Sequence, residues 1–144
     1  MKKKIAFSFI ALLVFVLTLA GCSDFAFNPV GKWHVAEERL YADSVLSYTK
    51  DVKDFEYGGQ TTLVFKKTGT GYIDSGARDK INFTYEYDDK TVTINIEKHG
   101  NIEAGTVVYD VADNGNEIVA TIQEYEEESG TNKVNYKKQT IFRR

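Results

Sequence analysis

Residues 81–98 read INFTYEYDDKTVTINIEK, and this stretch decides the fold class. Every second residue is apolar on either side of the central Asp88-Asp89 pair. A period of two places the apolar residues on one face of a β-strand, and adjacent aspartates favour a tight turn. The stretch therefore predicts two antiparallel strands that share one buried face.

The same alternation recurs from Gly31 to Arg144, with turn residues such as Asn114-Gly115 and Ser129-Gly130 between the runs. The runs are 32–39, 61–67, 71–75, 81–88, 90–98, 105–112, 116–125 and 133–142. About eight strands joined by short turns predict an all-β domain over 31–144. We expect an antiparallel up-and-down barrel, because closure removes exposed strand edges. A two-sheet β-sandwich places the same residues inward and stays open as an alternative.

Residues 40–60 interrupt this rhythm. Within them, Val45, Tyr48, Val52 and Phe55 are spaced nearly as on one face of a helix. A connection of this length inside a compact domain is usually functional or disordered. We therefore predict a short helix, or a lid across the mouth of the barrel.

The first 21 residues have the layout of a cleavable signal peptide. Lys2, Lys3 and Lys4 precede an apolar run over 5–17, which is shorter than the roughly 20 residues that span a bilayer. The run leads into the ending Leu19-Ala20-Gly21-Cys22.

This ending resembles the lipobox of bacterial lipoproteins, a Leu and two small residues before a Cys. The resemblance implies cleavage before Cys22, a diacylglycerol thioether on its nucleophilic thiol, and usually acylation of the new N-terminus. Residues 22–30 then form a short tether that holds the domain close to a lipid membrane. A plain hydrophobic anchor, or a secretory signal with a chance Cys, is the alternative.

The residues after Cys22 bear on location. In envelope lipoproteins of Gram-negative bacteria, Asp directly after the Cys favours retention in the inner membrane, and this chain has Ser23 there. We therefore expect the outer membrane. Asp24 is a weak sign of export to the surface, so the face of that membrane stays open.

Charge and cysteine content exclude several functions. Without residues 1–21, which hold three lysines and no acid, the net charge of −3 becomes −6. That charge argues against nucleic acid, which needs basic patches, and against a broad electrostatic attraction to anionic lipid. Cys22 is the only cysteine, so the domain has no disulfide and its aromatic residues must supply the core.

Gly31-Lys32-Trp33, at the start of the first strand, resembles the Gly-x-Trp motif of lipocalins. In that family the Trp closes the narrow end of the barrel, and an Arg near the last strand packs over its indole. The resemblance implies that Arg143 or Arg144 has this role, and we take Arg143 as the candidate beside Gly31 and Trp33. The long first loop also matches the family.

From Gly31 on, the chain is similar to small lipocalin-like lipoproteins of Bacteroidetes. It departs from lipocalins in three respects. No Thr-Asp-Tyr motif lies between the sixth and seventh strands, no helix follows the predicted strands, and there is no disulfide. The resemblance therefore supports the fold more than any ligand.

The sequence offers no catalytic constellation. His34 and His99 are far apart and have no metal-ligand spacing, and there is no nucleophile motif, phosphate loop or expected cofactor. We predict a protein that is not an enzyme. Glu124 and Glu126–Glu128 surround Tyr125; we read them as a solvated hairpin end, with calcium or a basic partner as the alternative.

Barrels of about eight strands either pack solid or hold one small ligand. The alternation predicts that the inward residues are Phe65, Phe83, Tyr85, Tyr87, Val92, Ile94, Ile96, Tyr109 and Ile122. Of these, the candidate lining of a ligand cavity is Phe65, Phe83, Tyr85, Tyr87, Ile94 and Tyr109. We predict that the barrel binds a small apolar or amphipathic molecule. The alternative is a protein partner bound through 40–60, through 124–132 or on the outer face.

Overall fold

The computed structural model describes residues 26–55, 59–76 and 79–144. These residues form nine strands and two single-turn 3-10 helices, η1 (Val52–Asp54) and η2 (Asp113–Gly115). The strands are β1 (Gly31–Ala42), β2 (Val45–Asp51), β3 (Thr62–Phe65), β4 (Thr70–Asp74), β5 (Ile81–Tyr87), β6 (Thr91–Ile96), β7 (Gly105–Ala112), β8 (Glu117–Ser129) and β9 (Asn132–Arg143).

The predicted signal peptide over 1–21 and the predicted lipidation site at Cys22 lie outside the described residues. In the part of the chain that is described, no helix has the length and apolar character needed to cross a membrane.

The strands form one antiparallel sheet in the order β2-β1-β3-β4-β5-β6-β7-β8-β9, and pairing of β1 with β9 closes it. Residues 31–34 of β1 pair with β3, and residues 34–42 pair with β9. β1 and β3 to β9 therefore make a closed eight-stranded up-and-down barrel. The predicted fold class is confirmed, and the β-sandwich alternative is excluded.

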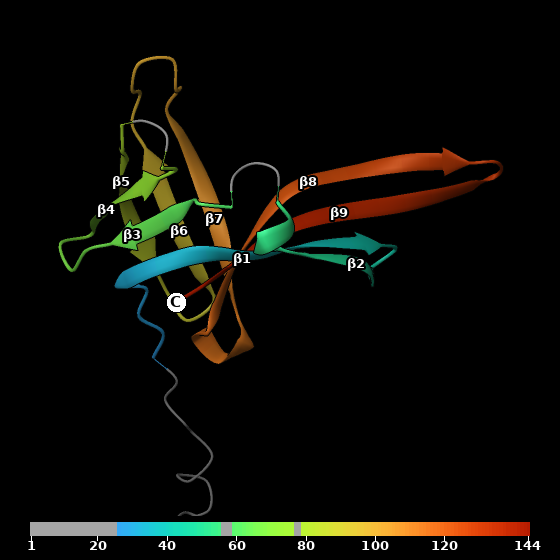
Figure 1. Cartoon of the computed structure of the whole chain (residues 1–144), viewed down its shortest axis with the longest axis horizontal. Coiled ribbons are helices and arrows are strands. Elements are labelled where there is room, and N and C mark those ends of the chain that lie inside the picture. Colours follow the sequence, from blue (N-terminus) through green and yellow to red (C-terminus); the bar gives the residue numbers. More distant parts are fainter. Residues whose placement is uncertain (1–25, 56–58, 77–78) are drawn as a thin grey trace, which may run out of the picture.

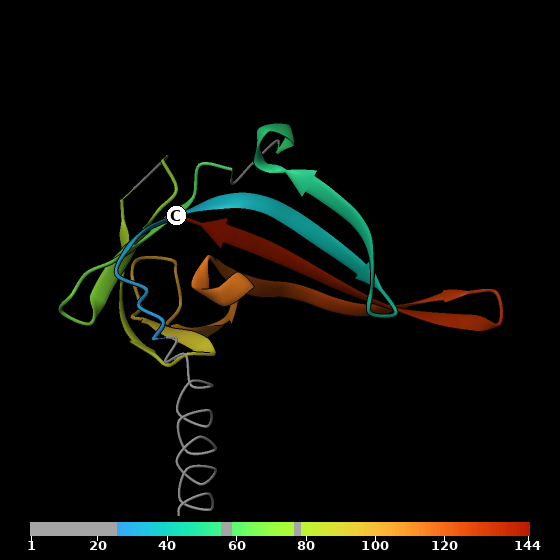
Figure 2. The ribbon, with the colours of Figure 1, turned by 90° about the horizontal axis from the view of Figure 1, so that it is seen from below.

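β1, β8 and β9 extend beyond the barrel, and β2 pairs with the extension of β1. β8 and β9 stay paired as far as Ser129 and Asn132, and β2 pairs with residues 37–42 of β1. Figures 1 and 2 show these strands extending away from the barrel as a projection. We call this projection the arm: β2 with residues 37–42 of β1, 121–129 of β8 and 132–139 of β9.

β2 replaces the helix predicted from the spacing of apolar residues in 40–60. Asp43 and Ser44 have positive φ values of 48° and 68°, which suits a two-residue hairpin turn. Asp-Ser is a weaker turn signal than Asn-Gly, so the sequence did not reveal the hairpin. Among the described residues of 40–60, only the turn at 52–54 is helical, and Val52 and Phe55 pack against the barrel core.

Residues that precede β1 cover the end of the barrel near Trp33. Phe27 is buried 6.1 Å from the Trp33 ring, and Pro29 is fully buried. The Trp33 Nε1–H donates to the Pro29 carbonyl at 2.7 Å, and the Phe27 N–H donates to Asp89 Oδ1 at 3.1 Å. The last residues of the predicted tether, 27–30, are thus part of the folded domain.

A close approach of two strands explains why residue 71 is a glycine. Gly69 has a positive φ of 78° and lies in the β3–β4 turn, but Gly71 lies within β4. A Cβ at Gly71 would meet the Val64 carbonyl oxygen and the ring of Phe83 well inside contact distance. The absence of a side chain at Gly71 lets the Phe83 ring pack against β4.

Candidate functional site

Most of the predicted cavity-lining residues fill the interior instead. The Phe65 ring lies 5.3 Å from Phe83 and 5.0 Å from Tyr85, and all three are buried. Ile94 is fully buried and pairs in register with Tyr85. These four residues come together as the sequence predicted, but they pack against one another rather than around a cavity. Tyr87 is exposed.

The Tyr85 hydroxyl donates to the Lys66 carbonyl at 2.6 Å. Burial, reinforced by the neighbouring Tyr87, raises the pKa of Tyr85 above its ordinary value. The phenol is therefore held as a neutral donor that ties β5 to the end of β3. Its hydroxyl is used within the fold and is not offered to a ligand.

An apolar groove lies at the other end of the barrel, beyond Val35. Its volume is about 330 Å³, near the lower limit of the roughly 300–1,000 Å³ of small-molecule sites. It is lined by Val35, Glu38, Phe55, Thr61, Val107, Tyr109, Ala120, Ile122, Thr140 and Phe142. Tyr109 is the one predicted lining residue among them.

The groove exists because β7 and β8 diverge. They pair only from Asp110 with Val119 to Ala112 with Glu117. Val107 and Tyr109 on β7 and Ala120 and Ile122 on β8 then face the groove from its two sides. A bulge between Thr121 and Gln123 contributes to this opening.

Two residues that the alternation predicts to face inward, Ile122 and Tyr109, line this opening. Ile122 is 52% exposed, because it lies at the bulge on the wall of the groove. Tyr109 is buried and its ring meets Phe142 edge-on at 5.8 Å. Burial raises the pKa of Tyr109 to about 12, so the aromatic part of the groove carries no charge at neutral pH.

Charged residues stand at the rim of this groove. Glu38, which lines it, binds Lys138 Nζ at 3.1 Å. Lys50 pairs in register with Glu38, and its Nζ lies 5.8 Å from the Phe55 ring centroid. One carboxylate and two ammonium groups therefore border an apolar interior. This is an arrangement that suits a molecule with an apolar body and a polar end.

The barrel-closing contact involves a different arginine from the predicted one. The Arg144 guanidinium lies 4.6 Å from the Trp33 ring centroid and donates to the Asn28 carbonyl. Arg143, our candidate, points away and binds Glu117 at 2.5 Å. Successive residues of a strand face opposite sides, so only one of the two can cover the indole. Gly31 opens β1 with a φ of 134°.

Arg143 belongs to a charged cluster on the outer face of the barrel, which the sequence analysis missed. Glu117 accepts hydrogen bonds from Arg143 and from Arg39, and both arginines also pair with Glu37. Arg39 crosses β9 to reach Glu117, and Ile141 on β9 is fully buried between them. Burial opposes ionisation of Glu117, but the hydrogen bonds from Arg143 and Arg39 outweigh it and lower the pKa of its carboxyl.

Each charge in this cluster has an opposite partner, and no nucleophile takes part. Its residues come from three strands, and even the nearest two on different strands, Glu117 and Arg143, are 26 positions apart, so no local motif signals it. The cluster covers and fixes the β8–β9–β1 seam. We assign it a structural role.

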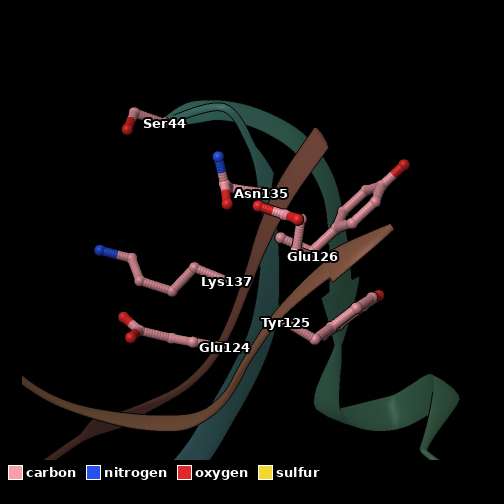
Figure 3. A pocket seen from close by; sticks show the side chains of 7 residues that line it. Ser44, Glu124, Tyr125, Glu126, Asn135 and Lys137 are labelled. Atoms are coloured by element: carbon pink, nitrogen blue, oxygen red, sulfur yellow. The ribbon is translucent and has the colours of Figure 1, made fainter. Parts of the chain in front are cut away.

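The acidic residues near Tyr125 lie on the arm, beside an open depression. Figure 3 shows Glu124 and Lys137 extending to one side of the hairpin and Tyr125 to the other. Tyr125 stacks on Tyr136 at 5.1 Å, and Glu126 binds Lys133 at 2.8 Å. The depression is lined by Ser44, Glu124, Tyr125, Glu126, Asn135, Tyr136 and Lys137.

Within residues 26–55, 59–76 and 79–144, no three His, Cys, Asp or Glu side chains are grouped so as to hold a metal ion. His34 and His99 are both exposed; His34 Nδ1 lies 3.1 Å from Thr62 Oγ1, and His99 closes a small bridge with Ile102. The groove is thus the feature of the described chain that best suits a ligand. Comparisons with protein-family models, curated proteins and solved structures find no match.

Proposed function

We propose that this protein is a non-enzymatic envelope lipoprotein whose barrel binds one small apolar or amphipathic molecule in the groove at its open end. The observation that carries the proposal is the divergence of β7 from β8, which leaves Val107, Tyr109, Ala120 and Ile122 lining an open space of about 330 Å³. At the closed end, sealed by Trp33, a depression of about 460 Å³ beside Asn28 and Tyr87 has the charged residues Lys67 and Glu86 in its lining.

The composition of the groove supports this class of ligand. Its walls are mostly aliphatic and aromatic, and each buried CH₂ group of a ligand contributes about 0.8 kcal/mol. Besides the Tyr109 hydroxyl, its polar side chains are Glu38, Thr61 and Thr140, and Glu38 and Thr140 are neighbours in register on β1 and β9. Such sites fix orientation through a small number of polar contacts and gain affinity from apolar area.

The lipid anchor predicted at Cys22 fits this role. A molecule with an apolar body partitions into membranes, and an anchor keeps the groove near that source. Phe27, near the start of the described residues, is buried at the closed end of the barrel, and the groove lies at the opposite end.

The test compares two matched variants with the wild-type full chain. Ile122→Asp introduces a carboxylate into the groove wall, at a side chain that is 52% exposed. Val108→Asp introduces a carboxylate on β7 outside the groove, at a side chain that is 51% exposed. Each protein is purified from envelopes in the same detergent, extracted with organic solvent, and the extract is analysed by mass spectrometry.

We expect one molecular species to co-extract in stoichiometric amount with the wild type and with Val108→Asp. Ile122→Asp should retain at most about a tenth of it, because a ligand in the groove would cover the new carboxylate without offering it a partner. Equal recovery from both variants, or no co-extracted species from the wild type, would contradict the proposal.

A further inference from the structure

β2 is an edge strand without the protection that edges usually carry. It pairs with β1 alone, and its outer edge has no partner strand among the described residues (Figure 2). Val45, Leu46 and Tyr48 are 69%, 50% and 52% exposed. Residues 45–49 are all exposed and include neither a charge nor a proline. Natural sheets usually cover, charge or shorten such an edge.

The exposed apolar groups lie on both faces of β2. Side chains alternate along a strand, so Val45 and Leu46 point to opposite sides. A ligand lying on one face of the arm would cover only part of them. A strand added at the outer edge would contact both faces and would also satisfy the free backbone N–H and C=O groups.

The other free edge in the arm is different in charge. β8 pairs with β7 only through residues 117–119, which leaves the edge of 120–129 open. That edge carries Glu124 and Glu126–Glu128. Two copies of β8 placed side by side would bring these carboxylates together, which is destabilising. β8 is therefore protected against pairing with itself.

β2 has no such protection. Its one Lys and one Asp, Lys50 and Asp51, make the strand neutral and lie together at one end. In an antiparallel pair of β2 strands, these charges lie beside the Val45 end of the other copy. Like charges are thereby kept apart, and the apolar halves of the two strands come into contact.

We propose that β2 is the dimer interface of this protein, and that two copies pair β2 with β2 in antiparallel register about a two-fold axis. The four-stranded arms then join into one continuous eight-stranded sheet. A two-fold interface uses the same patch on both copies, which matches an edge whose sequence does not repel itself. The inference is independent of the groove and of its ligand.

The first test places the photo-crosslinker p-benzoylphenylalanine at Tyr48 of the full chain in intact cells. Irradiation should give a product with twice the mass of the chain, and mass spectrometry should identify its crosslinked peptide as residues from β2 of the second copy. The same crosslinker at Val108, which is 51% exposed on β7, is the control and should give no such product. A Tyr48 crosslink to a different protein, or none at all, would overturn the proposal.

The second test measures the mass of the purified full chain by sedimentation equilibrium. Leu46→Lys brings two ammonium groups to the paired edges and should reduce the dimer fraction by about tenfold at a fixed concentration. Val108→Lys should leave it unchanged. Circular dichroism should show that both variants keep the β-sheet, because both side chains are half exposed. A monomeric wild type, or equal dimer fractions for the two variants, would refute a β2 interface.

Discussion

The Arg144 guanidinium covers the Trp33 indole at 4.6 Å, while its neighbour Arg143 turns to Glu117 on the other face. Arg144→Ala should shift the fluorescence of Trp33, the only tryptophan, and should lower the free energy of unfolding by about 0.5–1 kcal/mol. Urea unfolding followed by fluorescence measures both. Arg143→Ala should leave the emission spectrum unchanged. The opposite pattern would mean that Arg143 is the covering residue after all.

The contact between Gly71 and Phe83 predicts that β4 tolerates no side chain at this position. Gly71→Ala should destabilise the barrel by about 1–3 kcal/mol, because the new methyl overlaps the Val64 carbonyl and the Phe83 ring. Gly105→Ala is the matched control, since a Cβ there has no atom within 4 Å. Chemical denaturation of both variants measures the difference. Equal stability would argue against the close packing of β4 on β5.

The hydrogen bonds to Glu117 predict a loss of stability in acid. A carboxyl whose pKa is lowered by folding stabilises the native state above its ordinary value of 4.5, and this contribution disappears as the pH falls through the lower folded value. Glu117→Gln should cost about 1.5–3 kcal/mol at neutral pH and should flatten the acid side of the stability profile.

The control for this profile is Glu103→Gln, which removes an exposed ion pair with Lys98. Such pairs contribute little, so we expect the wild-type dependence on pH. Urea unfolding at several pH values compares the three proteins. If the free energy of unfolding falls equally steeply in acid with and without Glu117, other groups cause the loss of stability.

The raised pKa of Tyr109 predicts that the stability of the fold also depends on pH in the alkaline range. Its pKa of about 12 in the folded protein exceeds the ordinary value of 10.0, so the folded state holds a proton that the unfolded state releases. Stability should therefore fall as the pH rises from about 10 towards 12. Tyr109→Phe keeps the ring and should reduce this fall. NMR of ring-labelled tyrosine should show one phenol that ionises well after the exposed ones.

Cys22 carries the prediction of lipidation. Cys22→Ser removes the thiol and should abolish incorporation of labelled palmitate into the protein in growing bacteria. The matched variant Ser23→Ala should still be labelled, because the lipobox resemblance ends at the cysteine. Persistent labelling of Cys22→Ser would refute lipidation at this residue.

Alternation and turns were enough to predict an all-β domain of about eight strands, because each strand with one buried face carries its own period of two. Only the pairing of β1 with β9 separates the expected barrel from the β-sandwich. Alternation and turns also located Trp33 and the aromatic residues of the core. They did not separate a ligand cavity from a filled core, because that depends on the volumes of side chains that meet from distant strands. Phe65, Phe83 and Tyr85 meet in this way and fill the interior.

The local sequence pattern predicted the wrong structure where strand pairing depends on residues that are distant in the chain. Residues 44–55 have an almost helical spacing, yet β1 runs past the barrel to Ala42 and offers an edge that β2 completes. The groove, too, is absent from any local motif, since it arises where β7 and β8 stop pairing.

The sequence by itself thus determined the all-β class, the strands of the barrel and the residues that face inward along most of them, because these depend on period and turn chemistry within short segments. Tertiary structure alone decided which arginine covers Trp33, how Glu117 is paired, where the barrel opens and that β2 is left as a free edge. Each of these depends on the register and length of strands that meet across the barrel. The sequence of one strand does not determine its register with a strand that is distant in the chain.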